Sequence, residues 1–319
     1  MTNAAAACAL ALQGLMPHEN DQAFVHTTVT STSTAPAGVN LHVVSAGDPG
    51  RPLVVLLHGF PEHWGTWRQL MHTLVDAGFA VAAPDLRGYG GSDKPPGIDS
   101  YAMDPLIDDV EAIIRAQGRE KAHVIAHDWG GVVAWWLAMK RPHLVDKLVI
   151  VNSPHPLLML AKLRKSKRQL LKSSYMLLFA SPLAPPLLRM GDHAVVRAML
   201  KATKRKGAYS DDDVEGAVQA LRGDGLERAL SYYRAMVKGA RSTAAAAAAS
   251  SSSSQKIKAK TLIVWGKDDP VLGLDLVEGI ERYVDDVRVV PLERASHWVQ
   301  HDAPAELAAA VLDHLDPIP

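Results

Sequence analysis

Apolar and polar residues alternate along two segments near the start of the chain. Residues 24–29 and 39–44 show this alternation, which is typical of half-buried strands, and the Ser, Thr, Pro and Gly residues between them predict a β-hairpin. Later apolar runs do not alternate, and their lengths suit strands that are buried on both faces of a sheet. We predict such strands at residues 52–57, 80–83, 124–126, 148–151, 261–265 and 287–290.

Apolar residues recur at helical spacing between several of these runs. One predicted helix has apolar positions 67, 70, 71, 74 and 75, and Gly78 stands where a C-cap glycine is expected. The last helix begins near Pro304, with Asp302 as its candidate cap. Because strands and helices alternate, the pattern predicts an α/β fold with a mostly parallel sheet covered by helices on both faces. This last helix spans residues 304–314, and the other predicted helices span residues 103–116, 132–139 and 273–282.

The pattern changes after residue 152, where strands disappear and helices that mix apolar and basic residues dominate up to about residue 243. Residues 244–254 form a low-complexity Ala/Ser tract, which is typical of a flexible linker. Strand-like runs then return. We therefore predict a core whose first part is residues 1–152 (1–22 being an N-terminal arm) and whose second part is residues 255–319, with an inserted helical cap and its linker at 153–254.

Charge and length narrow the range of partners. The 319 residues include 34 basic and 34 acidic side chains, and this zero net charge argues against general nucleic-acid binding. Residues 157–171 carry a Lys/Arg-rich face, which is also typical of helices that bind a membrane surface or a partner protein. Because acidic residues nearby balance this charge, we interpret it as a solvated face. No apolar run reaches the ~18 residues that a membrane span needs.

The N-terminal composition bears on the cellular compartment. Cys8 is the only cysteine, so an intramolecular disulfide is excluded. Residues 4–15 are apolar, but no Lys or Arg precedes them as in a secretory signal. We expect a cytoplasmic protein with no nucleic-acid or membrane partner, either a monomer or a homodimer.

The segment around Asp128 indicates covalent chemistry. A predicted strand leads into His127, Asp128 and Trp129, two glycines follow, and a helix begins. Small residues two before and two after Asp128 allow the sharp turn of a nucleophile elbow, at which Ser is more usual. A helix cap would explain the Asp alone, but not its small neighbours. A carboxylate with an ordinary pKa of about 3.9 is ionised at neutral pH and can attack a saturated carbon, which forms an alkyl ester. The elbow therefore predicts substitution at an electrophilic carbon, as in an epoxide or alkyl halide.

Two further residues stand just after predicted strands. Asp269 follows the strand at 261–265, and His297 follows the strand at 287–290. The order nucleophile, acid, histidine is that of α/β-hydrolases, and active sites of parallel sheets lie outside the carboxyl ends of the strands. Asp-Asp-Pro is also ordinary turn sequence, and His297 could be a core histidine. We nevertheless expect Asp128, Asp269 and His297 to converge.

Five motifs in this order resemble those of the epoxide hydrolases of the α/β-hydrolase fold superfamily. The resemblance covers the chain from about residue 24 to its end. The motifs are His58-Gly59-Phe60-Pro61, Asp85-Leu86-Arg87-Gly88-Tyr89-Gly90, Ala126-His127-Asp128-Trp129-Gly130-Gly131, Gly266-x-x-Asp269 and Ser296-His297-Trp298.

This resemblance implies roles for the triad. Asp128 would be the nucleophile, and His297 would be the general base that activates water to hydrolyse the ester. Asp269 would orient His297, and it is preferred to Asp268 because it lies three residues after Gly266, where the family places this acid.

The resemblance also implies an oxyanion hole made by the backbone N–H groups of Phe60 and Trp129. Pro61 would be the family's cis-proline, which aims the Phe60 amide. Apart from the resemblance, we interpret Arg87 as a residue that stabilises a loop. The substrate pocket would be lined by Phe60, Pro61, Trp129, Phe179 and Trp298.

Two tyrosines of the inserted region match the family's proton donors for the epoxide oxygen. Tyr175 precedes Phe179 in the Y-x-x-x-F setting, and Tyr233, in preference to Tyr232, fits Y-R-x-M. Ala180 follows Phe179 where family members often have Gln, which affects pocket polarity more than chemistry. A phenol with a pKa of about 10 is protonated at neutral pH and can donate.

No cofactor or metal is implied, and the expected ligands are a small-molecule epoxide and water. His58, His63, His127 and His155 do not have the spacing of a metal site, so we interpret them as motif or packing residues.

Two alternative functions stay open. A haloalkane or haloacid dehalogenase also uses an elbow Asp, and Trp129 would suit a departing halide. Phe60, where those enzymes often have Asn, and the two tyrosine settings do not fit this alternative; haloacid enzymes also typically carry Arg where Trp129 stands. A non-catalytic ligand receptor on the same fold is disfavoured because all three triad positions are filled.

Overall fold

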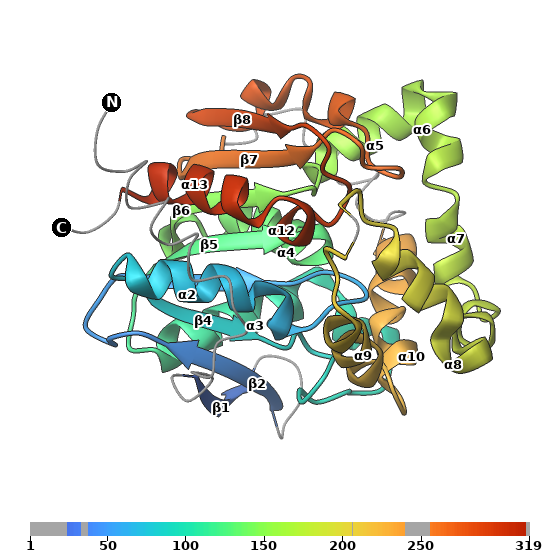
Figure 1. Ribbon diagram of the computed structural model, residues 1–319, viewed down its shortest axis with the longest axis horizontal. Coiled ribbons are helices and arrows are strands. Elements are labelled where there is room, and N and C mark those ends of the chain that lie inside the picture. The colour runs from blue at the N-terminus through green and yellow to red at the C-terminus, as the bar shows by residue number, and fades with distance from the viewer. Residues whose placement is uncertain (1–23, 33–37, 206, 240–255, 317–319) are drawn as a thin grey trace.

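The computed structural model describes residues 24–32, 38–205, 207–239 and 256–316 (Figure 1). An eight-stranded sheet with the order β1-β2-β4-β3-β5-β6-β7-β8 forms its centre. β1 pairs antiparallel with β2, and β2 pairs antiparallel with β4. All the other neighbours are parallel. The strands are β1 (Val25–Ser31), β2 (Val39–Ala46), β3 (Leu53–Leu57), β4 (Ala80–Pro84), β5 (Ala122–His127), β6 (Val145–Val151), β7 (Lys260–Gly266) and β8 (Val287–Leu292).

Helices cover both faces of the sheet, as predicted. α2 (Arg68–Asp76) and α13 (Pro304–Leu315) pack on one face, and α3 (Met103–Ala116) and α4 (Asp128–Lys140) pack on the other. Shorter helical segments connect these layers. They are η3 (Trp64–Trp67), η4 (Ile98–Tyr101), η5 (Pro142–Leu144) and α12 (Val299–Asp302).

The central strands are continuously apolar because each face meets a separate core. All five residues of β3 are buried. Val54 and Leu56 belong to the core beneath α2 and α13, whereas Val55 and Leu57 belong to the core beneath α3 and α4. Burying one such side chain contributes roughly 1.5–3 kcal/mol, so a polar residue on either face would be costly.

The predicted glycine cap of α2 is confirmed. Gly78 has a φ of +89°, and its N–H donates to Val75 O at 2.9 Å, while the N–H of Phe79 donates to Leu74 O at 3.0 Å. These two bonds satisfy carbonyls that a helix end leaves free.

Two local predictions are wrong. Residues 273–282 are not one helix but two short 3₁₀ turns, η6 (Leu274–Val277) and η7 (Ile280–Arg282). Glu278 is extended and Gly279 has a φ of +86°, so the helical path ends there. Asp302 does not cap α13, because the N-cap position is Ala303, which makes no side-chain cap bond.

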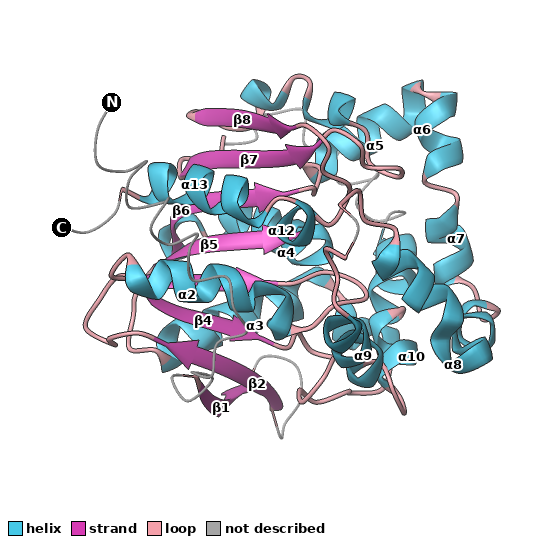
Figure 2. Ribbon diagram, viewed as in Figure 1, coloured by secondary structure: helices cyan, strands magenta, loops and turns pink. Residues whose placement is uncertain are grey.

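The helices between β6 and β7, which we call the cap helices, lie beyond the carboxyl ends of the parallel strands. In Figure 2 the arrowheads of these strands point towards them. Ser166 separates α5 from α6, so the basic stretch at 157–171 is not one helix. The cap helices are α5 (Pro156–Lys165), α6 (Lys167–Lys172), α7 (Tyr175–Ala180), α8 (Ala184–Lys201), α9 (Asp211–Ala220), α10 (Gly225–Ala229) and helical residues 231–239.

The predicted N-terminal arm at 1–22 and the Ala/Ser tract at 244–254 lie outside the described residues. Within those residues, none of the helices has both the length and the apolar character that crossing a membrane requires.

Candidate active site

Asp128 lies at the sharp bend between β5 and α4, where its φ is +47°. The adjoining chain leaves no room for larger residues. A Cβ on Gly130 would lie 2.4 Å from Leu57 O, and one on Gly131 would lie 2.3 Å from Ser153 Cβ. A Cβ on Gly59 would lie 2.4 Å from Asp128 Cβ. The two glycines that follow Asp128 and Trp129 are therefore required by close packing against β3 and Ser153.

The structure brings Asp128, His297 and Asp269 together at the carboxyl ends of β5, β8 and β7. His297 Nδ1 lies 2.7 Å from Asp269 Oδ2, and His297 Nε2 lies 3.5 Å from Asp128 Oδ2. The other carboxylate oxygen of Asp128 accepts a 2.9 Å hydrogen bond from the Phe60 N–H. One imidazole thus stands between two carboxylates, with its outer nitrogen directed to the elbow.

Electrostatics within this group favour the charged forms. Burial alone would lower the pKa of His297, but the negative charges of Asp269 and Asp128 raise it to about 10. Burial would raise the pKa of both carboxyl groups, but the interaction with His297 holds each pKa below its usual value. At neutral pH, the group therefore holds an imidazolium and two carboxylates.

Asp269 is fixed by donors that no motif in the sequence indicated. Its Oδ1 accepts 2.8 Å hydrogen bonds from the N–H groups of Val271 and Leu272. Its Oδ2 accepts a 2.7 Å bond from the side chain of Asn152, whose own carbonyl oxygen accepts from Gly266 N at 2.8 Å. Asn152 directly follows β6, and this position at a strand's carboxyl end was the signal that could have revealed it. The neighbouring Asp268 is exposed and makes none of these contacts.

A group of aromatic rings from the core and the cap helices surrounds the elbow. The ring of Tyr233 lies 4.9 Å from that of Trp129, 5.8 Å from that of Phe60 and 6.4 Å from that of Tyr175. Phe179 lies 5.4 Å from both Phe60 and Tyr175. Burial and the nearby charge of Asp128 raise the pKa of both tyrosines, so their phenols hold their protons.

Tyr232, the neighbour of Tyr233, has a different environment. Its hydroxyl donates to Arg87 O at 2.9 Å, and its ring packs on Tyr89 and Tyr101. Arg87 itself is buried and pairs with Asp109 at 2.5 Å, which fits the loop-stabilising role expected for it. The hydroxyl and ring of Tyr232 therefore bind this loop, and Tyr233 is the tyrosine that lies beside Asp128.

The remaining predicted pocket residues border the same region. The Phe60–Pro61 peptide bond is cis, as the resemblance implied. The ring of Trp298 lies 4.9 Å from that of His297, and its indole N–H donates to Met199 O in α8 at 3.0 Å. Trp129 is the second residue of α4, so its N–H has no intrahelical acceptor and is free to bind an anion.

A buried pair behind the triad was missed from the sequence. Glu62 Oε2 lies 2.8 Å from His127 Nδ1, and His127 Nε2 lies 2.9 Å from the carbonyl oxygen of His297. Glu62 also accepts from Tyr209 at 2.5 Å and from Gln300 at 2.7 Å. Burial would raise the pKa of Glu62, but His127 holds it well below its usual value. His127 fell inside the elbow motif and Glu62 directly follows the His58–Pro61 motif, yet nothing in the sequence paired them.

Asp302 connects the loop of His297 to the loop that follows α8. It is fully buried, and its Oδ2 accepts from Ser296 N at 2.7 Å and from Ser296 Oγ at 2.5 Å. Its Oδ1 accepts 2.8 Å bonds from the N–H groups of Lys204 and Arg205. The carboxylate that was predicted to cap a helix thus satisfies four donors from two separate loops.

The histidines that were considered for a metal site instead make structural contacts. His58 Nε2 accepts from Leu86 N at 3.0 Å, and the His63 side chain accepts from Gly65 N at the start of η3. His155 stacks on Tyr283 at 4.6 Å, and burial lowers its pKa to about 4. Within the described part of the chain, no group of three or more His, Cys, Asp or Glu side chains is arranged to hold a metal ion.

Comparison with known proteins agrees with this arrangement. The family profile of the alpha/beta hydrolase fold matches residues 52–304. The chain is 39% identical over 283 residues to AB hydrolase superfamily protein YfhM of Bacillus subtilis, covering 87% of this chain and 95% of that protein. It is 33% identical over 276 residues to epoxide hydrolase 4 of Homo sapiens, covering 84% of this chain and 73% of that protein.

Solved structures give the same result. Bacillus megaterium epoxide hydrolase in complex with an inhibitor superposes with a TM-score of 0.79 at 29% identity, covering 92% of this chain and all 100% of that one. Epoxide hydrolase A from Mycobacterium thermoresistibile gives a TM-score of 0.75 at 29% identity, over 92% of this chain and 98% of that one. The chain therefore belongs to the epoxide hydrolase family of enzymes with the α/β-hydrolase fold.

Proposed function

We propose that this enzyme hydrolyses a small-molecule epoxide to a vicinal diol through a covalent ester on Asp128. The observation that carries the proposal is the position of one ionised carboxylate, with a histidine–aspartate pair behind it and two protonated phenols in front of it. Core residues 1–152 and 255–319 would supply the triad, and the insertion at 153–254 would supply the phenols.

In the first step, a carboxylate oxygen of Asp128 attacks one ring carbon of the epoxide. The new C–O bond forms as the ring C–O bond breaks, and the ring oxygen takes a proton from Tyr175 or Tyr233. The resulting tyrosinate then takes a proton from the His297 imidazolium. Ester formation has removed one of the two negative charges that held this proton, so the pKa of His297 falls.

In the second step, the neutral His297 takes a proton from water as the water oxygen attacks the ester carbonyl of Asp128. The N–H groups of Phe60 and Trp129 would stabilise the oxyanion of the tetrahedral intermediate. Collapse of the tetrahedral intermediate breaks the bond between the ester carbon of Asp128 and the diol oxygen. The diol oxygen then takes the proton of the Asp128 carboxylic acid. Asp128 is then ionised again and His297 is an imidazolium, so the cycle closes with one water consumed.

A turnover panel tests the proposed reaction. Styrene oxide and aliphatic and bulky epoxides are to be compared with haloalkanes, with diol formation and halide release measured separately. Diol formation from epoxides is the expected result. Halide release without diol formation would instead assign a dehalogenase, and tight ligand binding without any turnover would indicate a receptor.

Replacement of both candidate donors, Tyr175→Phe with Tyr233→Phe, is expected to slow ring opening by about 10²–10⁴-fold, which is the usual contribution of a general acid. Binding should persist because the rings stay. The rate of ester formation is to be measured in a single turnover by rapid quench. Tyr232→Phe is the matched control, since its hydroxyl bonds Arg87 O instead. Ring opening at the parental rate in the double variant would refute the assignment of the donors.

The pKa of His297 provides a test of the charge distribution. Nitrogen NMR of the parent should show its imidazole titrating at about 10. Asp128→Asn removes one of its two carboxylate partners, so the titration should move down by about 1–3 pH units. His155, whose pKa burial lowers to about 4, is the internal control and should not move. An unchanged His297 titration would mean that Asp128 does not hold its proton.

The same pKa shift predicts the direction of a stability change. The pKa of His297 is raised above 6.5 in the folded chain, so its ion pairs stabilise the fold fully below about pH 6.5. This contribution to the free energy of unfolding is lost as the pH rises through about 10.

A further inference from the structure

The outer side of the cap helices exposes an unusual number of large apolar side chains. Among the described residues, ten of the twelve exposed large apolar side chains lie in the segment that contains the cap helices, and eight of these fall between residues 170 and 195. They follow α6, α7 and α8, which form the column farthest from the sheet (Figure 1). We call these eight the apolar cap face: Leu170, Leu171, Leu177, Leu178, Leu183, Leu187, Met190 and Val195.

The same segment is strongly cationic. Residues 156–201 contain nine Lys and Arg residues and a single acidic residue, Asp192, although the whole chain is neutral. Arg164, Lys165 and Lys167, where α5 meets α6, are exposed and form no ion pair with any residue in the described ranges. Unneutralised positive charge therefore adjoins the apolar cap face.

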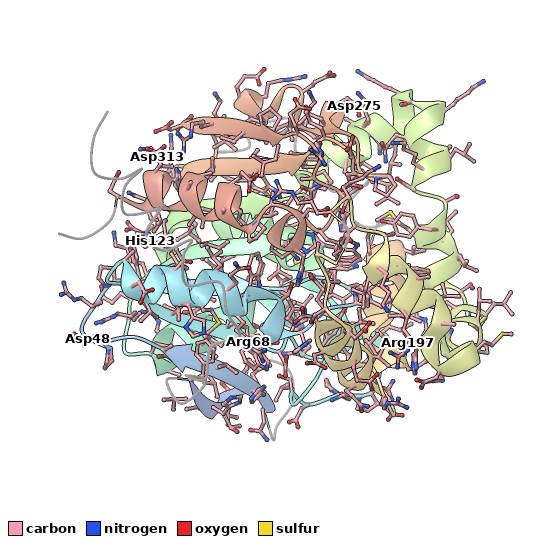
Figure 3. All side chains as sticks on the ribbon, in the orientation of Figure 1. Asp48, Arg68, His123, Arg197, Asp275 and Asp313 are labelled. Atoms are coloured by element: carbon pink, nitrogen blue, oxygen red, sulfur yellow. The ribbon has the colours of Figure 1, made fainter. Side chains whose placement is uncertain are left out.

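Other basic side chains of the segment are neutralised within the protein. Arg197, labelled on the cap in Figure 3, lies 2.7 Å from carboxylate oxygens of both Asp192 and Glu215. Lys162 lies 2.6 Å from Asp275, which Figure 3 also labels. The balance of charge that suggested a solvated face thus holds for these residues, but not for the cations beside the exposed leucines.

We propose that the apolar cap face, together with Arg164, Lys165 and Lys167, binds the surface of an anionic lipid bilayer. Exposed leucines flanked by basic residues bind this kind of interface, because the leucines enter the acyl boundary and the cations attract anionic headgroups. Two of the three cations are lysines, whose flexible charge suits a diffuse anionic surface more than one bidentate partner. A second copy of the chain is disfavoured as the occupant of this surface, because its own Arg164, Lys165 and Lys167 would face the same cations of the first copy.

This surface lies one helix away from the candidate active site. In α7, Phe179 is buried and Tyr175 packs against it, whereas Leu177 and Leu178 are exposed. A bilayer on the outer side would therefore contact the same short helix that carries a candidate proton donor. Association with lipid is a property beyond the proposed reaction, and it does not depend on that reaction.

Sedimentation of the full chain with lipid vesicles tests the proposal. The protein should sediment with phosphatidylcholine vesicles that contain phosphatidylserine, should bind pure phosphatidylcholine far more weakly, and should dissociate as salt is added. Leu171→Gln with Leu183→Gln should weaken binding by about tenfold or more, since both side chains lose their apolar insertion. Lys165→Glu with Lys167→Glu should weaken it by about tenfold or more, since each lysine near the surface contributes to the attraction.

Matched variants on other faces serve as controls. Val25→Gln with Ile98→Gln removes the two large apolar side chains that, within the described ranges, are exposed outside the cap helices. Lys121→Glu with Arg282→Glu makes the same change of charge at residues that precede β5 and β8 in the chain, outside the cap helices. Both pairs should bind vesicles like the parent. Absence of parental binding, equal binding to neutral vesicles, or equal losses in the controls would overturn the proposal. A dimer that the leucine variant dissociates, without vesicle binding, would assign the face to a second copy.

Discussion

Asp128→Ala is expected to reduce epoxide turnover by roughly ten-thousand-fold or more, as loss of a covalent nucleophile does in other hydrolases. The carboxylate is the only group at the elbow that can form the ester, and the amide of Phe60 already directs one of its oxygens. Diol formation measured under saturating substrate, together with a thermal melting curve, checks this result. A folded variant without turnover is the expected outcome.

A second variant guards against a misfolded protein. Asp128 has a φ of +47°, a conformation that Asn tolerates better than Ala, so Asp128→Asn should keep the bend. Asp268→Ala removes an exposed carboxylate next to Asp269 and should keep parental turnover. Appreciable diol formation by folded Asp128→Ala would mean that water attacks the epoxide directly and that no ester forms.

His297→Gln is expected to stop the reaction after its first step. Asp128 can still be alkylated, but no base remains to activate water, so the ester accumulates. Intact-mass spectrometry should show an increase equal to the mass of the substrate, and peptide mapping should place it on Asp128. The double variant Asp128→Ala with His297→Gln should show no such increase. An adduct on another residue would refute the assigned nucleophile.

Isotope labelling separates the two chemical steps independently of any variant. In a single turnover in water enriched in oxygen-18, the label should enter the carboxylate of Asp128, because water attacks its ester carbonyl. Label that enters the diol directly and never the protein would contradict the covalent route.

Much of the fold followed from local patterns in the sequence. Runs such as residues 52–57 are apolar at every position because two cores meet at each central strand, and this signal needs no knowledge of partners. The bend at Asp128 was also visible, since small residues around a nucleophile are a local signature of a strand, a sharp turn and a helix. The contacts that require Gly130 and Gly131, however, come from β3 and from Ser153 after β6. The predicted 273–282 helix failed because the positive φ at Gly279 overrode a helical spacing of apolar residues.

Thus the sequence by itself determined the succession of the core strands along the chain, the elbow and the residues expected to follow β7 and β8. Only the tertiary structure decided which buried polar groups meet: Glu62 with His127, Asn152 with Asp269, and Asp302 with Ser296 and the loop that follows α8. It also decided which basic residues of the cap remain unpaired. The physical reason is that periodicity and turn chemistry act over a few neighbouring residues, whereas a buried carboxylate is satisfied by donors that the fold brings from distant segments.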